Sequence, residues 1–307
     1  QYYSYSQKDL LELMLYNSLK YLIFLLAISG IFACERGITV KQPEIQHEES
    51  DLRLAFSVTE FSVGSNRIRF SLIDTKTGPV KAETVIVRTF YLEERETKTP
   101  KDTQTARYYV WPKPGTGIYG IETIFTEPGK WGIGVTVENN HDKRVASGHI
   151  TVSNKSVTPE IGKEIPMMDH VIIDNSHAIN HITSDPDPYL PFYQTKIADS
   201  VESNRGTVVM FSSPAFCKTG TCGPQLEIIK TLHPKFQKDL DFIHIEIYKN
   251  PHMLEGKIDK SDINPIVSKW NLPSEPWTFV ANRSGILTHK FEGLVTAKEL
   301  MEALVNG

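Results

Sequence analysis

The stretch Thr207-Val-Val-Met-Phe-Ser-Ser-Pro-Ala-Phe-Cys-Lys-Thr-Gly-Thr-Cys-Gly-Pro-Gln225 is the most informative part of this chain. It begins with an apolar, β-branched run that is typical of a buried strand, and it is followed by the amphipathic run Leu226–Leu232. Cys217 and Cys222 therefore lie between a strand and the start of a helix. Backbone N–H groups at a helix start favour a thiolate, and a second cysteine nearby can close a disulfide. The pattern indicates thiol chemistry.

The whole chain has 307 residues, which is room for about two domains at roughly 100–200 residues each. It is 40% hydrophobic and 23% charged, as is ordinary for a globular protein. The formal net charge is −4 and no basic block is present, so nucleic acid is not predicted as a partner. Three cysteines are too few for a disulfide scaffold, which leaves Cys217 and Cys222 as an isolated pair beside Cys34.

The N-terminal segment has the features of an export signal. Residues 21–33 form an uncharged apolar run of about thirteen residues, shorter than the ~20 that span a bilayer. We predict a signal peptide over residues 1–33, with 14–33 as its authentic part because Met14 is a natural start. Ile31-Phe-Ala-Cys34 resembles a bacterial lipobox, which implies a lipidated Cys34, although Phe32 departs from the usual small or β-branched residue. A plain membrane anchor is the alternative, and residues 34–50 are predicted to be a polar tether.

Residues 51–153 are predicted to form an all-β domain. Apolar and polar residues alternate along 67–73 and 84–91, and turn signals such as Glu127-Pro-Gly129 separate the runs. About seven short strands of this kind favour an antiparallel sandwich. The closing strands resemble those of immunoglobulin-like extracellular modules. Three aromatic residues are interpreted as core or edge packing rather than as a ligand site: Trp111, Tyr119 and Trp131.

Residues 154–190 are predicted to be a linker because they contain four prolines and no clear periodicity. His177 and His181 have the spacing that would place them on one face of a helix, and His170 precedes them. The surrounding Asn, Ser and Pro residues favour a loop instead. The histidines are interpreted as incidental, and no metal site is predicted.

Residues 191–307 contain a regular order of elements. The pattern predicts helix, strand, helix, strand, short helix, hairpin and helix, with bounds at 197–203, 207–211, 224–236, 241–248, 262–269, 276–291 and 297–305. Asn282-Arg-Ser-Gly285 is the hairpin signal, and Thr296 with Glu299 is a capping-box pattern that opens the last helix.

This order, with the cysteine pair before the second helix, resembles the thioredoxin fold over about 115 residues. The resemblance is to thioredoxin-domain lipoproteins of bacteria, and it implies a cis-proline beside the cysteines, which Pro276 matches by its place before the hairpin. The fold class expected is therefore an α+β two-domain chain. It has an N-terminal all-β immunoglobulin-like sandwich, followed by an α/β thioredoxin-like domain.

The cysteines depart from the Cys-Gly-Pro-Cys motif of thioredoxins. Spacing from the strand favours Cys217 as the nucleophile, whereas Cys222-Gly-Pro-Gln225 matches the motif locally with its last cysteine replaced. We expect a disulfide between Cys217 and Cys222, and which thiol attacks stays open. The resemblance implies Cys217, Cys222 and Pro276 as catalytic residues. The neighbours implied to bind substrate are Phe216, Gly223, Pro224, Glu275 and Trp277.

The resulting hypothesis is a membrane-anchored lipoprotein of the cell envelope that exchanges disulfides with exported proteins or a redox partner, without a cofactor. Two alternatives stay open. One is a non-enzymatic binding or scaffold lipoprotein whose disulfide is structural. The other is copper handling by two cysteines and a distant histidine, although His244 is expected to be a packed residue of the sheet.

Overall fold

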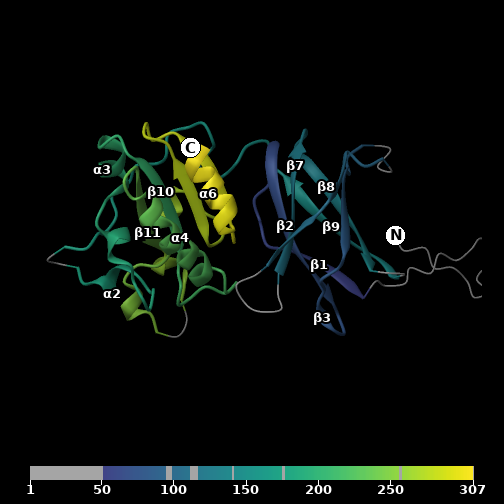
Figure 1. The fold of residues 1–307 in the computed structure, drawn as a ribbon, viewed down its shortest axis with the longest axis horizontal. Helices are drawn as coiled ribbons and strands as arrows, with labels where there is room; N and C mark the ends of the chain where they lie inside the picture. The colour runs from purple at the N-terminus through teal and green to yellow at the C-terminus, as the bar shows by residue number, and fades with distance from the viewer. Residues whose placement is uncertain are drawn as a thin grey trace, which may run out of the picture. The chain divides into compact units, whose positions relative to one another are not determined.

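The computed structural model describes residues 51–94, 99–110, 117–139, 142–174, 177–255 and 258–306. Residues 49–307 form one compact unit. Within the described ranges the chain is a β-rich two-domain fold with three sheets (Figure 1). The predicted signal peptide, the tether, the lipidation residue Cys34 and the aromatic residue Trp111 lie outside the described residues.

Two antiparallel sheets contain the strands of residues 52–152. One has the order β1-β2-β7-β6 with β3 paired to β2, and the other has the order β5-β4-β8-β9. The strands are β1 (Leu52–Phe56), β2 (Gly64–Asp74), β3 (Gly78–Pro79), β4 (Thr84–Tyr91), β5 (Asp102–Thr105), β6 (Arg107–Val110), β7 (Gly117–Phe125), β8 (Gly129–Asn139) and β9 (Asp142–Val152).

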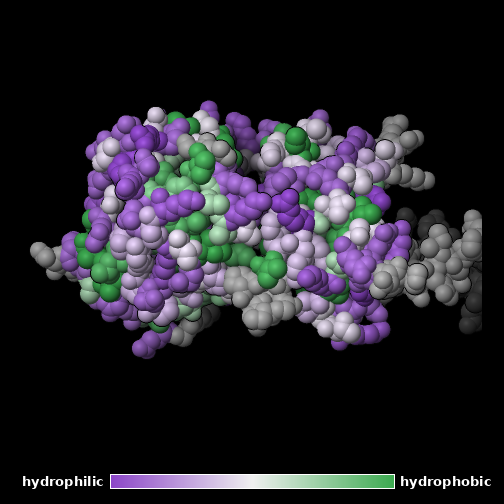
Figure 2. Space-filling view, viewed as in Figure 1, coloured by the Kyte–Doolittle hydropathy of each residue, from purple (hydrophilic) through white to green (hydrophobic). Residues whose placement is uncertain are grey.

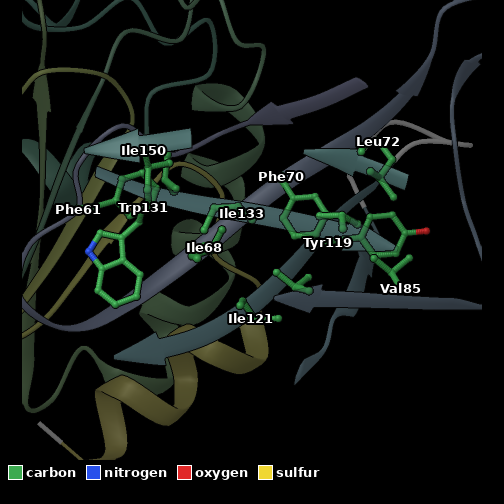
Figure 3. Close-up of a cluster of buried hydrophobic side chains, with 14 of the residues drawn as sticks. Phe61, Ile68, Phe70, Leu72, Val85, Tyr119, Ile121, Trp131, Ile133 and Ile150 are labelled. Atoms are coloured by element: carbon green, nitrogen blue, oxygen red, sulfur yellow. The ribbon is translucent and has the colours of Figure 1, made fainter. Parts of the chain in front are cut away.

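A single apolar cluster joins these two sheets. Alternate residues of β2 and β8 point into it, as Figure 3 shows for Ile68, Phe70 and Ile133. Tyr119 and Trp131 are also buried there, at 2% and 1% exposure, so the prediction that they are packing residues is confirmed. The indole N–H of Trp131 donates to the backbone oxygen of Glu127 at 2.9 Å, which satisfies its polar atom inside the core.

The third sheet belongs to the C-terminal part of the chain and has the order β11-β10-β12-β13. β10 is parallel to β11 and antiparallel to β12, and β12 is antiparallel to β13. Its strands are β10 (Gly206–Ser212), β11 (Leu240–Glu246), β12 (Trp277–Ala281) and β13 (Leu287–Glu292). The α-helices are α2 (Ile179–Ile182), α3 (Ile197–Glu202), α4 (Cys222–Phe236), α5 (Pro265–Lys269) and α6 (Ala297–Asn306), and the 3-10 helices are η1 (Leu190–Tyr193), η2 (Pro251–Met253) and η3 (Lys260–Asp262).

Both faces of the third sheet are covered. Val208 and Met210 of β10 pack with α4 and α6, whereas Val209 and Phe211 pack with α3 and α5. Figure 1 shows α4 and α6 beside the strands of this sheet. Every residue of β10 is buried, as expected for a central strand whose alternate side chains enter two cores. The strand therefore gives the cysteine loop that follows it a rigid base.

Several bounds differ from the sequence prediction: β11 ends at Glu246 rather than at Tyr248, and α5 begins at Pro265 rather than at Asp262. α4 begins at Cys222 rather than at Pro224, because proline is tolerated in the first helical turn, where its missing N–H has no helical partner. His181, predicted to be in a loop, lies in the single turn of α2. The predicted capping box of α6 is confirmed, since the N–H and hydroxyl of Thr296 donate to Glu299 and the N–H of Glu299 donates to Thr296.

The segment after β1 is bonded to the last strand of the third sheet. The carboxylate of Glu292 accepts from the N–H and hydroxyl of Thr59 and from the N–H of Glu60. It also accepts from the hydroxyl of Ser274. Glu292 is thereby connected both to the sandwich and to the segment that leads into Glu275.

Polar and apolar residues are mixed on the surface. Figure 2 shows hydrophobic residues in patches that hydrophilic ones interrupt on the face viewed. None of the helices in the described ranges has the length and hydropathy that crossing a bilayer requires.

Candidate functional site

The cysteine loop connects the end of β10 to the start of α4. The predicted disulfide between Cys217 and Cys222 is present, with the two Cα atoms 6.0 Å apart. The backbone oxygen of Ser213 accepts from the N–H groups of Phe216 and Cys217, which forms a tight turn before the first cysteine. Gly220 has φ +68°, a conformation that glycine adopts without strain, and it returns the chain to the helix.

The two sulfur-bearing residues differ in access to solvent. Cys222 is the first residue of α4 and is 0% exposed. Cys217 is half-buried in the loop, and its Sγ lies 3.2 Å from the hydroxyl oxygen of Thr219. An incoming group therefore reaches Cys217 before Cys222.

Glu275 places a carboxylate beside the buried sulfur. It precedes Pro276, and the peptide bond between them is cis, as the resemblance implied. Its Oε2 lies 3.4 Å from Cys222 Sγ and accepts from the N–H and hydroxyl of Ser213 at 2.7 and 2.6 Å. A disulfide sulfur carries no proton, so the contact becomes a donated hydrogen bond only when the cysteines are reduced.

A second carboxylate, Glu246, is buried at the end of β11. Its Oε2 accepts from the N–H and the hydroxyl of Ser184, both at 2.7 Å. The same hydroxyl oxygen accepts from the N–H of Ala215 in the cysteine loop, at 3.2 Å. Glu246 and Ser184 thus hold the cysteine loop in place through this chain of hydrogen bonds.

Burial governs the charge of both carboxyl groups. It raises the pKa of Glu246 to about 8; the hydrogen bonds from Ser184 oppose this and the negative charge of Glu275 adds to it. Burial also raises the pKa of Glu275, against the hydrogen bonds from Ser213. Glu246 is therefore protonated at neutral pH.

His244 is a packed residue of the sheet, which confirms the prediction from its strand position. Its ring nitrogens lie 2.8 Å from the hydroxyl oxygens of Tyr193 and Ser212. Burial lowers the pKa of His244 to about 4, so the ring is neutral near pH 7. Because both ring nitrogens are engaged, this histidine is poorly suited to be the distant copper ligand.

The other predicted substrate residues lie in three different surroundings. The ring of Phe216 meets that of Tyr248 edge-on. Gly223 and Pro224 line a mostly apolar groove of about 610 Å³, together with Pro186, Pro214 and Ile228. Trp277 is 2% exposed and stacks on Phe279, and Pro276 is also buried.

The linker histidines do not join the cysteines. The side chain of His177 pairs with that of Asp174. The ring of His181 stacks on that of His252, with 3.9 Å between the ring centroids. In the part of the chain that the structure describes, the one trio of potential metal ligands brought together is Cys217, Cys222 and Glu275.

Sequence reasoning missed Glu246, Ser184 and Ser213. The available signal for Glu246 was a carboxylate in an otherwise apolar strand, two residues after His244. Ser184 gave no signal, because it lies in the predicted linker far from the cysteines in sequence.

No protein-family model and no curated protein matches the chain. Among solved structures it is similar to an engineered protein, at 12% identity over 33% of this chain and 20% of that chain, with a TM-score of 0.24. StoA from Bacillus subtilis has 15% identity over 33% of this chain and 82% of that chain, with a TM-score of 0.26. A conjugative transposon lipoprotein from Bacteroides eggerthii has 14% identity over 34% of this chain and 98% of that chain, with a TM-score of 0.22. These TM-scores are too low to support an argument about function, which is inferred below from side-chain geometry.

Proposed function

We propose that this chain is an extracytoplasmic thiol–disulfide oxidoreductase of thioredoxin type. The observation that carries the proposal is the asymmetry of the disulfide: half-buried Cys217 is bonded to fully buried Cys222, beside the carboxylate of Glu275. A strand–loop–helix setting, in which β10 has one parallel and one antiparallel neighbour in the sheet, supports a thioredoxin-like domain. A structural disulfide would not need an accessible first sulfur.

Exchange begins with the reduced protein. The Cys217 thiolate attacks one sulfur of a substrate disulfide, a mixed disulfide forms, and the first substrate thiolate leaves and takes a proton from water. Cys222 then gives its proton to Glu275, 3.4 Å away, and attacks the Cys217 sulfur. The bond to the substrate breaks as the Cys217–Cys222 bond forms, so two electrons pass to the substrate. The reverse sequence oxidises a substrate dithiol.

The apolar groove beside the cysteines is the proposed contact for the substrate chain. Gly223 and Pro224 form part of its wall, and the phenyl ring of Phe216 lies on the cysteine loop. Pro276 and Trp277 are buried, so their role is to hold Glu275 in place rather than to contact the substrate. The proposed partners are exported proteins or a redox partner protein.

The proposed location is the outer surface of a cell membrane. It rests on the apolar run at 21–33 and the lipobox-like sequence ending at Cys34. The lipid on Cys34 would tether the two domains to the membrane through residues 34–50.

Single-cysteine variants test this function. Cys222→Ser, reduced and mixed with a peptide disulfide, should accumulate a mixed disulfide at Cys217, because the resolving thiol is missing. Cys217→Ser should form none at Cys222, because that thiol is buried. Mass spectrometry after acid quenching gives the readout, and insulin reduction by the wild-type protein checks turnover. A reduction potential below about −300 mV without turnover would instead identify a structural disulfide.

A further inference from the structure

We propose that the reduced site binds Zn²⁺ through the sulfurs of Cys217 and Cys222 and the carboxylate of Glu275. The ligand atoms of these three residues all lie within 4.8 Å of one another. The proposal goes beyond disulfide exchange and rests on the proposed function only in requiring that the disulfide be reducible.

The spacing of the ligand atoms fits a tetrahedral zinc ion. Zinc bonds of about 2.3 Å to sulfur and about 2.0 Å to a carboxylate oxygen, at a tetrahedral angle, place the two atoms about 3.5 Å apart. Cys222 Sγ and Glu275 Oε2 are 3.4 Å apart, so two ligands already have the required separation. Cys217 needs only to move its sulfur to about 3.8 Å from that of Cys222. The half-buried loop that carries it allows such a side-chain rotation.

The carboxylate is held in place by a second layer of contacts. The N–H and hydroxyl of Ser213 donate to Glu275 Oε2 at 2.7 and 2.6 Å. Hydrogen bonds of this kind orient metal-binding carboxylates, and their loss typically weakens metal binding about 10–100-fold. Ser213 follows β10 directly and is buried, so the ligand is fixed by the sheet.

The ligand set favours zinc over copper(I). Zn²⁺ accepts thiolate and carboxylate ligands together, whereas copper(I) is selected by soft sulfur ligands, to which a carboxylate adds little. His244, the imidazole considered as a copper ligand, has both ring nitrogens engaged. Three protein ligands, with half-buried Cys217 on the solvent side, leave a fourth position for water.

Formation of the site follows from ordinary thiol chemistry. A dithiol reductant transfers two electrons to the Cys217–Cys222 bond, which becomes two thiols while the reductant becomes a disulfide. Zn²⁺ then displaces the two thiol protons, which pass to the buffer. The bound ion blocks the attack of either sulfur on a substrate, so zinc and substrate disulfides compete for the reduced protein.

Cobalt titration tests the site. The protein is reduced with dithiothreitol without oxygen and desalted, and its thiols are counted against the oxidised protein. Co²⁺ is then added as a spectroscopic substitute for Zn²⁺. We expect two additional thiols, one Co²⁺ per chain with a thiolate-to-cobalt charge-transfer band, and loss of the band when Zn²⁺ is added.

Three variants assign the ligands. Cys217→Ser should lose the band, and Glu275→Gln should weaken Co²⁺ binding at least about tenfold, by analogy with lost carboxylate contacts. Glu202→Gln, an exposed carboxylate on α3, is the matched control and should bind as the wild type does. If Glu275→Gln fails to fold, Ser213→Ala tests the same carboxylate by removing the hydroxyl that donates to it. We expect a similar weakening of Co²⁺ binding.

The possible failures are distinguishable. Two additional thiols without a charge-transfer band, or a band that neither Glu275→Gln nor Ser213→Ala weakens, would overturn the zinc site and leave disulfide exchange intact. If no additional thiols appear, the disulfide is not reducible in the folded protein, and both proposals fail.

Discussion

The buried carboxyl group of Glu246 should make the stability of the oxidised protein fall as the pH rises. Its pKa is about 8 in the folded chain against an ordinary value of 4.5, and only 2% of its surface is exposed. Since the folded pKa is the higher one, this group's contribution to stability is complete below pH 4.5 and is lost as the pH approaches 8. At about 1.4 kcal/mol per pH unit, the loss between pH 6.5 and 8.0 is about 2 kcal/mol.

Comparison with a variant that lacks the ionisation isolates this group, because buried histidines also titrate near pH 6.5. The pKa of His244 is lowered by burial from 6.5 to about 4, so this group adds stability as the pH rises through 6.5, equally in the wild type and in the variant. Glu246→Gln keeps the shape of the side chain and removes the ionisation. The N–H of Ile247 donates to the other carboxylate oxygen at 3.1 Å. If the amide nitrogen of the variant faces this N–H, the bond is lost at equal cost at both pH values.

The measurement is urea denaturation of the oxidised proteins at pH 6.5 and 8.0, followed by circular dichroism. Between the two pH values we expect the wild-type protein to lose about 2 kcal/mol of stability relative to Glu246→Gln. Glu227→Gln, an exposed carboxylate on α4, serves as a control with the wild-type slope. Equal slopes for the wild type and Glu246→Gln would refute the assignment of a raised pKa to this group.

Three further outcomes follow from other contacts. Arg69→Met should destabilise the protein by about 1.5–3 kcal/mol, because Arg69 is 2% exposed and its removal breaks the 2.7 Å charged hydrogen bond to Glu299, which keeps Arg67 at 3.3 Å. Thermal denaturation checks this, and a change below 1 kcal/mol would contradict it. The pKa values of Glu60 and Glu299 are lowered to about 2 despite burial, by hydrogen bonds and by the charges of Lys290 and Arg67 respectively. Acid titration should therefore show the stability falling as the pH drops from about 4.5 toward 2. A stability that does not change over this range would contradict the lowered pKa values. Phe211→Ala should lower the stability by about 3–5 kcal/mol, because it leaves a cavity between the sheet and the helices α3 and α5. Urea denaturation measures this, with Val110→Ala, a substitution at an exposed position, as the reference.

Local patterns predicted the parts of the site that are close in sequence. The apolar run before Cys217 and the amphipathic run after Cys222 are each unambiguous, and the bond between the cysteines needs only a short loop. Pro276 was found by its place before a hairpin, since the hairpin signal at 282–285 is also local.

The features of the site that the sequence did not predict depend on which distant segments cover the sheet. Asp241–Tyr248 alternates, which indicates a strand with one polar face, yet Glu246 on that face is buried because Ser184 of the preceding segment lies over it. Trp277 was expected to contact substrate, but β12 is a central strand whose faces are both covered, so its ring enters the core. No periodicity in a single strand reveals what a distant loop will cover.

The position of Lys218 has a practical consequence. It is exposed and lies inside the ring that the Cys217–Cys222 bond closes. A protease that cuts after lysine can therefore open the peptide chain there without separating its two halves while the sulfurs remain bonded. Nicked protein would migrate as one band on a non-reducing gel and as two after reduction, which makes the oxidation state of the pair visible by electrophoresis alone.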